Sequence, residues 1–116
     1  MIRKRLIKYL VMIFMLSINT TYASTYSGKI SSIIVRDSDG LVYINIEGVR
    51  VGNIPACSKY NYMMIKNENS ATGKRQLAQL LMAQATNKTV VITGHETCTR
   101  WEDGEDINYV DIRTNN

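Results

Sequence analysis

"KISSIIVRDSDGLVYINIE", residues 29–47, carries the pattern that decides the fold. Its first part is rich in β-branched residues, and in its second part Val42, Ile44 and Ile46 alternate with Tyr43 and polar residues. A strand with one buried face shows this period of two. The Asp and Gly of the intervening "RDSDG" suit a tight reversal. The stretch therefore predicts two strands, over 29–35 and 41–47, joined as a hairpin.

Three further strands are predicted after Gly48, Gly52, Asn53 and Pro55, which interrupt regular structure. They are "KYNYMMI" (59–65), "TVVIT" (89–93) and "INYVDI" (107–112). In the last of these, positions 107, 109 and 111 are expected on one face and positions 108, 110 and 112 on the other.

One amphipathic helix is predicted over 70–86, with Ser70 as its N-cap and Asn87 as its stop. Residues at helical spacing define its expected buried face: Leu77, Leu80, Leu81, Gln84 and Ala85. Three strands, a helix and two strands predict an α+β fold, a small five-stranded antiparallel sheet or barrel packed on that helix. The strand and helix alternation of a parallel α/β fold is missing.

Residues 1–23 have the features of a secretory signal peptide. Arg3, Lys4, Arg5 and Lys8 precede an apolar run, and the segment closes on small residues up to Ala23. The run is about half of the roughly 20 residues that span a bilayer, so we expect no membrane span after cleavage. The expected product is one exported domain, 24–116, that is secreted or periplasmic.

Removal of that segment changes the charge balance. The chain has 14 Lys and Arg against 10 Asp and Glu, and 14 − 4 leaves 10 against 10 after residue 23. A neutral domain without a run of basic residues does not favour a nucleic-acid partner.

Cys57 and Cys98 are the only cysteines of the chain. Small exported domains commonly carry disulfides, so the pair predicts one bridge. Oxidation would remove the thiolate that a cysteine nucleophile beside His95 requires.

The stretch "GHETCTRWEDGEDINY", 94–109, contains residue types that occur in catalytic and metal sites. His95, Glu96 and Cys98 lack the second histidine of a zinc helix signature, so no metal and no cofactor is predicted. The four acids at 102, 103, 105 and 106 could serve a glycosidase, but four acids around a glycine favour a solvated turn. We therefore expect no enzyme.

The best candidate contact surface of this stretch contains Arg100, Trp101 and Asp103, with Tyr60 and Tyr62 as the next candidates. Arg100 and Asp103 are expected to be solvated. Trp101 has two interpretations. An aromatic face beside polar and charged groups is typical of a carbohydrate site, whereas a Trp three positions after a bridged cysteine often packs on the disulfide.

The segments "IPACSKYNYMM" (54–64), "GKRQLAQLLMAQATNKTVVI" (73–92) and "CTRWEDGEDINYV" (98–110) carry a resemblance over nearly all of the domain. With the strand order and the export signal, the chain resembles the B subunits of bacterial toxins of the subtilase cytotoxin and pertussis type. It is also similar to small exported bacterial proteins of uncharacterised function. No glycan-contacting residue of the toxin family maps onto this sequence.

The resemblance implies an oligonucleotide/oligosaccharide-binding (OB) barrel, a homo-pentamer and a cell-surface glycan as ligand. The expected function is therefore an exported, non-enzymatic binding module. The alternative is a periplasmic inhibitor or accessory protein that contacts another protein.

Overall fold

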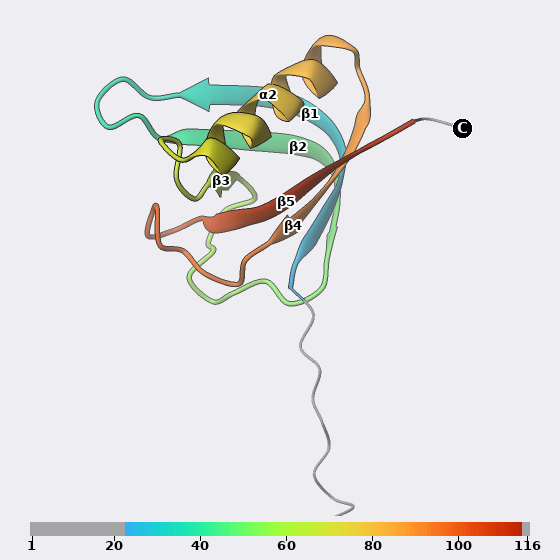
Figure 1. The fold of residues 1–116 in the computed structure, drawn as a ribbon. Coiled ribbons are helices and arrows are strands. Elements are labelled where there is room, and N and C mark those ends of the chain that lie inside the picture. Colours follow the sequence, from blue (N-terminus) through green and yellow to red (C-terminus); the bar gives the residue numbers. More distant parts are fainter. Residues whose placement is uncertain (1–22, 115–116) are drawn as a thin grey trace, which may run out of the picture.

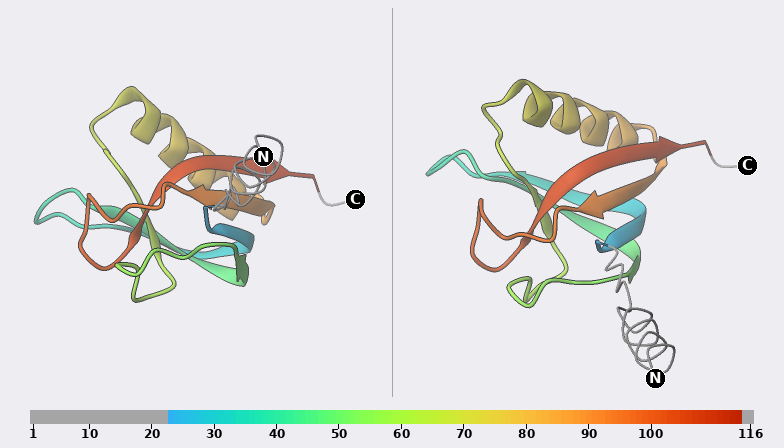
Figure 2. Two further views of the ribbon diagram at one scale, coloured as in Figure 1. Left: turned by 90° about the horizontal axis from the view of Figure 1, so that it is seen from below. Right: turned by 60° about the horizontal axis from the view of Figure 1, so that its bottom comes forward.

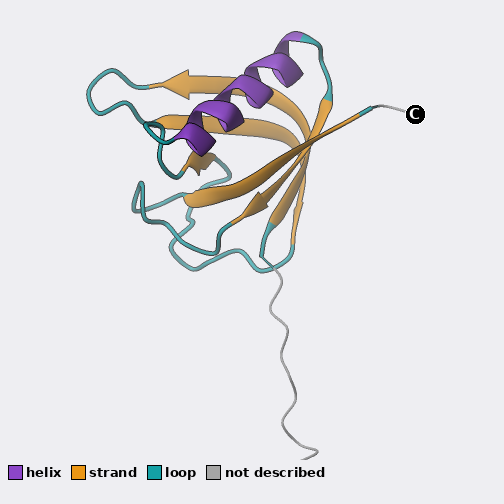
Figure 3. Cartoon of the chain, in the orientation of Figure 1, coloured by secondary structure: helices purple, strands orange, loops and turns teal. Residues whose placement is uncertain are grey.

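The computed structural model describes residues 23–114. Within this range, five strands and one helix follow in the order β1 (Thr25–Val35), β2 (Val42–Val51), β3 (Met63–Ile65), α2 (Ala71–Ala85), β4 (Thr89–Gly94) and β5 (Glu105–Arg113) (Figures 1 and 3). The expected signal peptide, except for Ala23, lies outside the described residues. No helix within residues 23–114 has the length and apolar character needed to cross a bilayer.

The strands close into a barrel in the order β1-β2-β3-β5-β4. All neighbours are antiparallel except β3 and β5, which run parallel through Met63↔Glu105 and Ile65↔Ile107. This is the five-stranded, OB-like arrangement, and it confirms the α+β fold with one helix. The predicted hairpin over 29–47 is confirmed, and Gly40 supplies the positive φ of its turn (+77°).

The core lies inside the barrel, with α2 packed on β1, β3 and β5. Figure 2 shows the helix on the side of the barrel opposite the long loop between β2 and β3. As predicted, α2 begins after Ser70, whose Oγ accepts from Gly73 N at 2.9 Å. It ends before Asn87, which takes a left-handed φ of 53°.

The predicted buried face of the helix was wrong by part of a turn. Leu80 is buried, but Leu81 is 49% exposed, and the other buried positions are Gly73, Gln76 and Ala83. Gln76 turns inward because its amide nitrogen donates to the carbonyl of Asn108 at 2.9 Å. Gly73 faces Asn67 closely, since a Cβ there would lie 1.9 Å from the Asn67 carbonyl oxygen.

Two strand predictions also need correction. The third strand is confirmed only over Met63–Ile65, because the residues before it form the irregular loop that the disulfide holds. In β5 the register slips, so that Thr93 pairs with Tyr109 and Gly94 with Ile107. This bulge at Asn108 places Ile107 and Val110 inside and leaves Tyr109 53% exposed, which breaks the predicted alternation.

Candidate functional site

The disulfide between Cys57 and Cys98 is present as predicted, with 6.2 Å between the two Cα atoms. It joins the β2–β3 loop to the β4–β5 loop, residues 95–104. Lys59 N also donates to the Asp103 carbonyl at 3.0 Å. Two loops whose cysteines are 41 residues apart in sequence are therefore held together as one surface.

The buried Asp106 carboxylate holds the β4–β5 loop in place through hydrogen bonds. Its carboxylate accepts hydrogen bonds from the hydroxyls of Thr97 and Thr99, both at 2.7 Å, and from the backbone N–H groups of Thr99 and Arg100. Burial raises the pKa of Asp106, but these bonds outweigh burial and hold the pKa below its ordinary value. The loop is thus wrapped around a buried anion.

Glu105 is the second buried acid of this stretch. Its side chain pairs with Arg50 at 2.8 Å and also accepts from the Ser24 hydroxyl and from Glu96 N. The expectation of four solvated acids around Gly104 was therefore wrong for two of them, since Glu105 and Asp106 are fully buried. Both carboxylates have a structural role. Each is buried, and each is paired with groups from other parts of the chain, as a buried polar group requires.

Arg100 was expected to be solvated, and this was wrong. Its guanidinium donates to both Glu68 oxygens, at 2.9 and 2.8 Å, and to the Asp39 carbonyl at 2.9 Å, and its side chain is only 19% exposed. Glu68 raises the pKa of Arg100, and in turn the Arg100 hydrogen bonds lower the pKa of Glu68. Arg100 therefore links the β1–β2 turn, the β3–α2 loop and the β4–β5 loop.

Four aromatic side chains form what we call the aromatic surface: Tyr43, Tyr60, Tyr62 and Trp101. Tyr62 stacks on Tyr60 and meets Tyr43 edge to face, with 5.5 Å between ring centroids in each pair. Tyr60 is 58% exposed.

Asp103 fixes the middle of the aromatic surface, because its carboxylate accepts from the Tyr62 hydroxyl. Burial and this bond raise the pKa of Tyr62. Gly104 lets the loop approach this ring, since a Cβ there would lie 2.8 Å from Tyr62. Asp103, which was expected to be solvated, is half-buried.

Trp101 borders a small recess of about 90 Å³. Tyr43 and Tyr62 form its other aromatic walls, and Leu41 and Met64 add apolar atoms. The guanidinium of Arg36 lies 4.3 Å from the Trp101 ring centroid and covers one face of the indole. The structure thus brings together Trp101, Asp103, Tyr60 and Tyr62, and the ion network of Arg100 adjoins them through Asp39 and Arg36.

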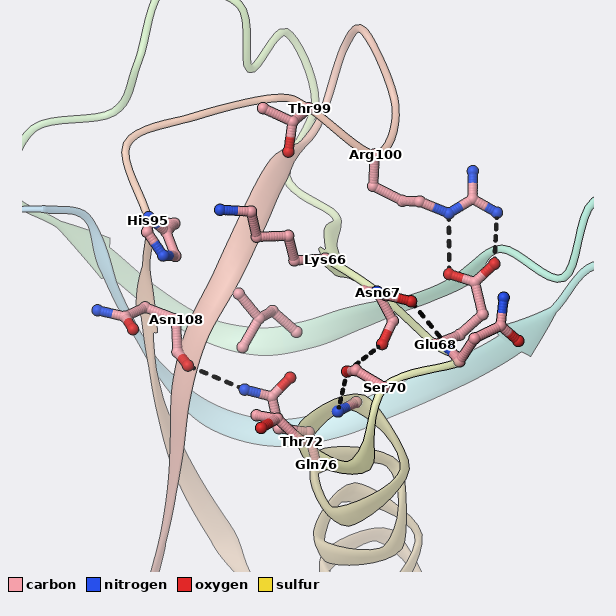
Figure 4. Close-up of a pocket in the computed structure, with 13 residues that line it drawn as sticks. Lys66, Asn67, Glu68, Ser70, Thr72, Gln76, His95, Thr99, Arg100 and Asn108 are labelled. Carbon is pink, nitrogen blue, oxygen red and sulfur yellow. Dashed lines mark hydrogen bonds and ion pairs between the residues drawn. The ribbon is translucent and has the colours of Figure 1, made fainter.

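A second feature, which we call the polar cleft, has a volume of about 590 Å³. It lies between the start of α2, the β3–α2 loop and the β4–β5 loop (Figure 4). The side chains that line it are mostly amides, hydroxyls and charged groups, among them Lys66, Glu68, Gln76, His95 and Asn108. Sequence reasoning missed this cleft, because its residues come from three separate segments without a shared motif.

His95 lines the polar cleft and is exposed. Within residues 23–114, no group of three or more His, Cys, Asp or Glu side chains is placed to hold a metal ion. No protein-family model matches the chain, and comparisons with curated proteins and with solved structures also find no match.

Proposed function

We propose that this protein is an exported, non-enzymatic binding module that recognises a glycan through the aromatic surface. The observation that supports the proposal is the stacked Tyr60–Tyr62 pair beside the recess at Trp101. The C–H groups of a sugar ring pack well on an aromatic face, while tyrosine hydroxyls can bond to the sugar hydroxyls. The recess has the size and the apolar walls for a single small substituent such as an acetyl group.

The position of the aromatic surface on the barrel favours the same interpretation. OB barrels bind oligonucleotides and oligosaccharides on the face of strands 2 and 3 and on the loops that join strands 1 to 2 and 4 to 5. Here Tyr43 lies on β2, Tyr62 directly precedes β3, and Trp101 belongs to the β4–β5 loop.

Charge favours a sugar over a nucleic acid as the ligand of this surface. Residues 24–116 carry 10 basic and 10 acidic side chains, and the Arg36 guanidinium at the surface is already paired with Asp39 at 2.6 Å. Single-stranded nucleic acid sites combine stacking aromatic rings with a positively charged groove. The aromatic surface has the aromatic rings, but its positive and negative charges balance, which fits a sugar better than a nucleic acid.

The surface is also held in place before any ligand arrives. The disulfide fixes the β4–β5 loop, and the Tyr62–Asp103 hydrogen bond fixes the central ring. A binding site that is already ordered loses less conformational entropy on association.

The proposal is tested by screening the processed, disulfide-bonded protein on a glycan array and then titrating it with the glycan that binds best. Tyr60→Ala should weaken binding by about tenfold or more, which corresponds to about 1.4 kcal/mol. Tyr109→Ala is the control, since Tyr109 is similarly exposed but lies on β5. An array without a bound glycan, or full binding by folded Tyr60→Ala and Trp101→Leu variants, would reject the aromatic surface.

A second candidate function is that of a periplasmic inhibitor or accessory protein. Val49 and Val51, 67% and 57% exposed, lie two residues apart on β2, and Ile54 follows at 42%. Exposed aliphatic side chains at neighbouring positions favour a protein partner. Val49→Thr with Val51→Thr should abolish capture of such a partner from a periplasmic extract and leave glycan binding unchanged.

A further inference from the structure

We propose that the polar cleft binds a small hydroxylated anion, a molecule with one carboxylate or phosphate group beside several hydroxyl groups. The cleft shares no side chain with the aromatic surface, so this inference does not depend on glycan binding there. Its volume of about 590 Å³ lies within the range of small-molecule sites and leaves room for more than an inorganic ion.

The positive charge of the cleft comes from a lysine, and a histidine lines the cleft with it. Lys66 directly follows β3 and His95 directly follows β4, and both line the cleft. In the part of the chain that the structure describes, neither side chain has a hydrogen bond or an ion pair. Figure 4 shows the Lys66 amine extended toward the side of the cleft where His95 lies. An amine without a partner can bind a carboxylate or phosphate, and an imidazole can donate a hydrogen bond to it.

The other two charges that face the cleft neutralise each other. The Arg100 guanidinium is committed to both carboxylate oxygens of Glu68, so the pair forms a fixed wall. The charge left for a ligand is therefore the positive charge of Lys66, which favours an anion over a neutral molecule or a cation.

The remaining lining suits hydroxyl groups. Gln76 is buried, and its amide nitrogen is held by the Asn108 carbonyl, which leaves its amide oxygen as an acceptor on the cleft side. Asn67 accepts from Asn69 N through its side-chain oxygen, which leaves its amide nitrogen as a donor. A hydroxyl group both donates and accepts, so it can pair with either kind of group.

The start of α2 does not supply the anion site. Ser70 Oγ already accepts from Gly73 N, and Lys74 N donates to the Ser70 carbonyl. Recognition therefore depends on the side chains of Lys66, His95, Gln76 and Asn67, which substitutions can address one at a time.

The proposal is tested by titrating the processed protein with galacturonate, glucose 6-phosphate and glucose. Binding is monitored by the amide chemical shifts in NMR spectra. At least one of the two acids should bind with shifts at the cleft and at least tenfold more tightly than glucose, and its affinity should fall as salt is raised. Binding of galacturonate alone assigns a carboxylate ligand, and binding of glucose 6-phosphate alone assigns a phosphate ligand.

Lys66→Gln should weaken binding of the acid about tenfold, and His95→Asn should weaken it several-fold. The matched control is Lys74→Gln, an exposed lysine on α2 that does not line the cleft, which should change affinity less than twofold. Tyr60→Ala should also leave it unchanged, which separates this site from the aromatic surface. The proposal is overturned if neither acid binds at about 20 mM, if glucose binds equally well, or if Lys66→Gln binds like the wild type.

Discussion

Arg50 and Glu105 form an ion pair in the interior of the protein, with 2.8 Å between Nη2 and Oε1 and side chains that are 6% and 0% exposed. The pair joins the end of β2 to the start of β5, and the Ser24 hydroxyl brings in the start of β1. Arg50 Nη2 also donates to Ser58 in the β2–β3 loop at 3.2 Å. The end of β2, the residue before β1 and the start of β5 therefore meet at a single buried carboxylate.

Arg50→Met should lower the free energy of unfolding by about 3 to 5 kcal/mol, because it leaves the Glu105 carboxylate buried without its counter-charge. Urea denaturation measures the change. Arg113→Met is the control, since the Arg113 side chain is 61% exposed and its loss should cost no more than about 0.5 kcal/mol. Equal effects of the two changes would contradict a structural role for the pair.

Asp106 should make stability depend on acid pH. Its pKa in the folded protein lies below the ordinary value of 3.8, so folding favours the ionised form. The resulting stabilisation is present above about pH 4 and is lost as pH falls through the folded pKa. Asp106→Asn should destabilise the protein at pH 7 by about 1 to 3 kcal/mol and flatten the loss of stability below pH 4. A variant whose acid unfolding profile matches the wild type would contradict this.

The Arg100–Glu68 pair should contribute measurably to stability, unlike an ordinary surface ion pair. Both side chains are largely buried and the contact is bidentate, so Arg100→Ala should cost about 1 to 3 kcal/mol. A double-mutant cycle with Glu68→Ala isolates the pair itself and should give a coupling of at least about 0.5 kcal/mol. Additive single effects would show that the two side chains act independently.

The disulfide should be complete and stabilising. Thiol titration of the denatured, unreduced protein should find no reactive cysteine, as both cysteines of the chain are bridged. Replacement of both by Ser should lower the free energy of unfolding by about 2 to 5 kcal/mol, because the bridge restricts the unfolded chain. Two titratable thiols in protein from an oxidising compartment would contradict the bridge.

Assembly into a pentamer is the expectation that the toxin resemblance carries. Light scattering at micromolar concentration should give a mass near five protomers, and Val49→Lys should lower it if the exposed end of β2 lies at the contact. A strict monomer would remove the pentamer and favour the accessory-protein function.

The order of elements, the hairpin turn, both ends of α2 and the disulfide could all be predicted from the sequence. Each depends on neighbouring residues or on residue identity: a period of two in 41–47, Ser70 as an N-cap, and the presence of two cysteines. The length of β3 and the bulge in β5 could not be predicted from the sequence. The disulfide-bridged loop limits β3, and pairing with β4 produces the bulge in β5.

The sequence by itself determined an α+β domain with one disulfide, and it identified the aromatic and charged residues of the 98–103 stretch as candidates. Only the tertiary structure decided what each of them does. Glu102 and Glu105 are the same residue type and both lie within two residues of Gly104, yet Glu105 is fully buried and paired with Arg50 whereas Glu102 is exposed. Arg100 is neutralised by Glu68, 32 residues away. The physical reason is that the environment of a charge depends on partners from distant segments, which are brought together only when the barrel closes.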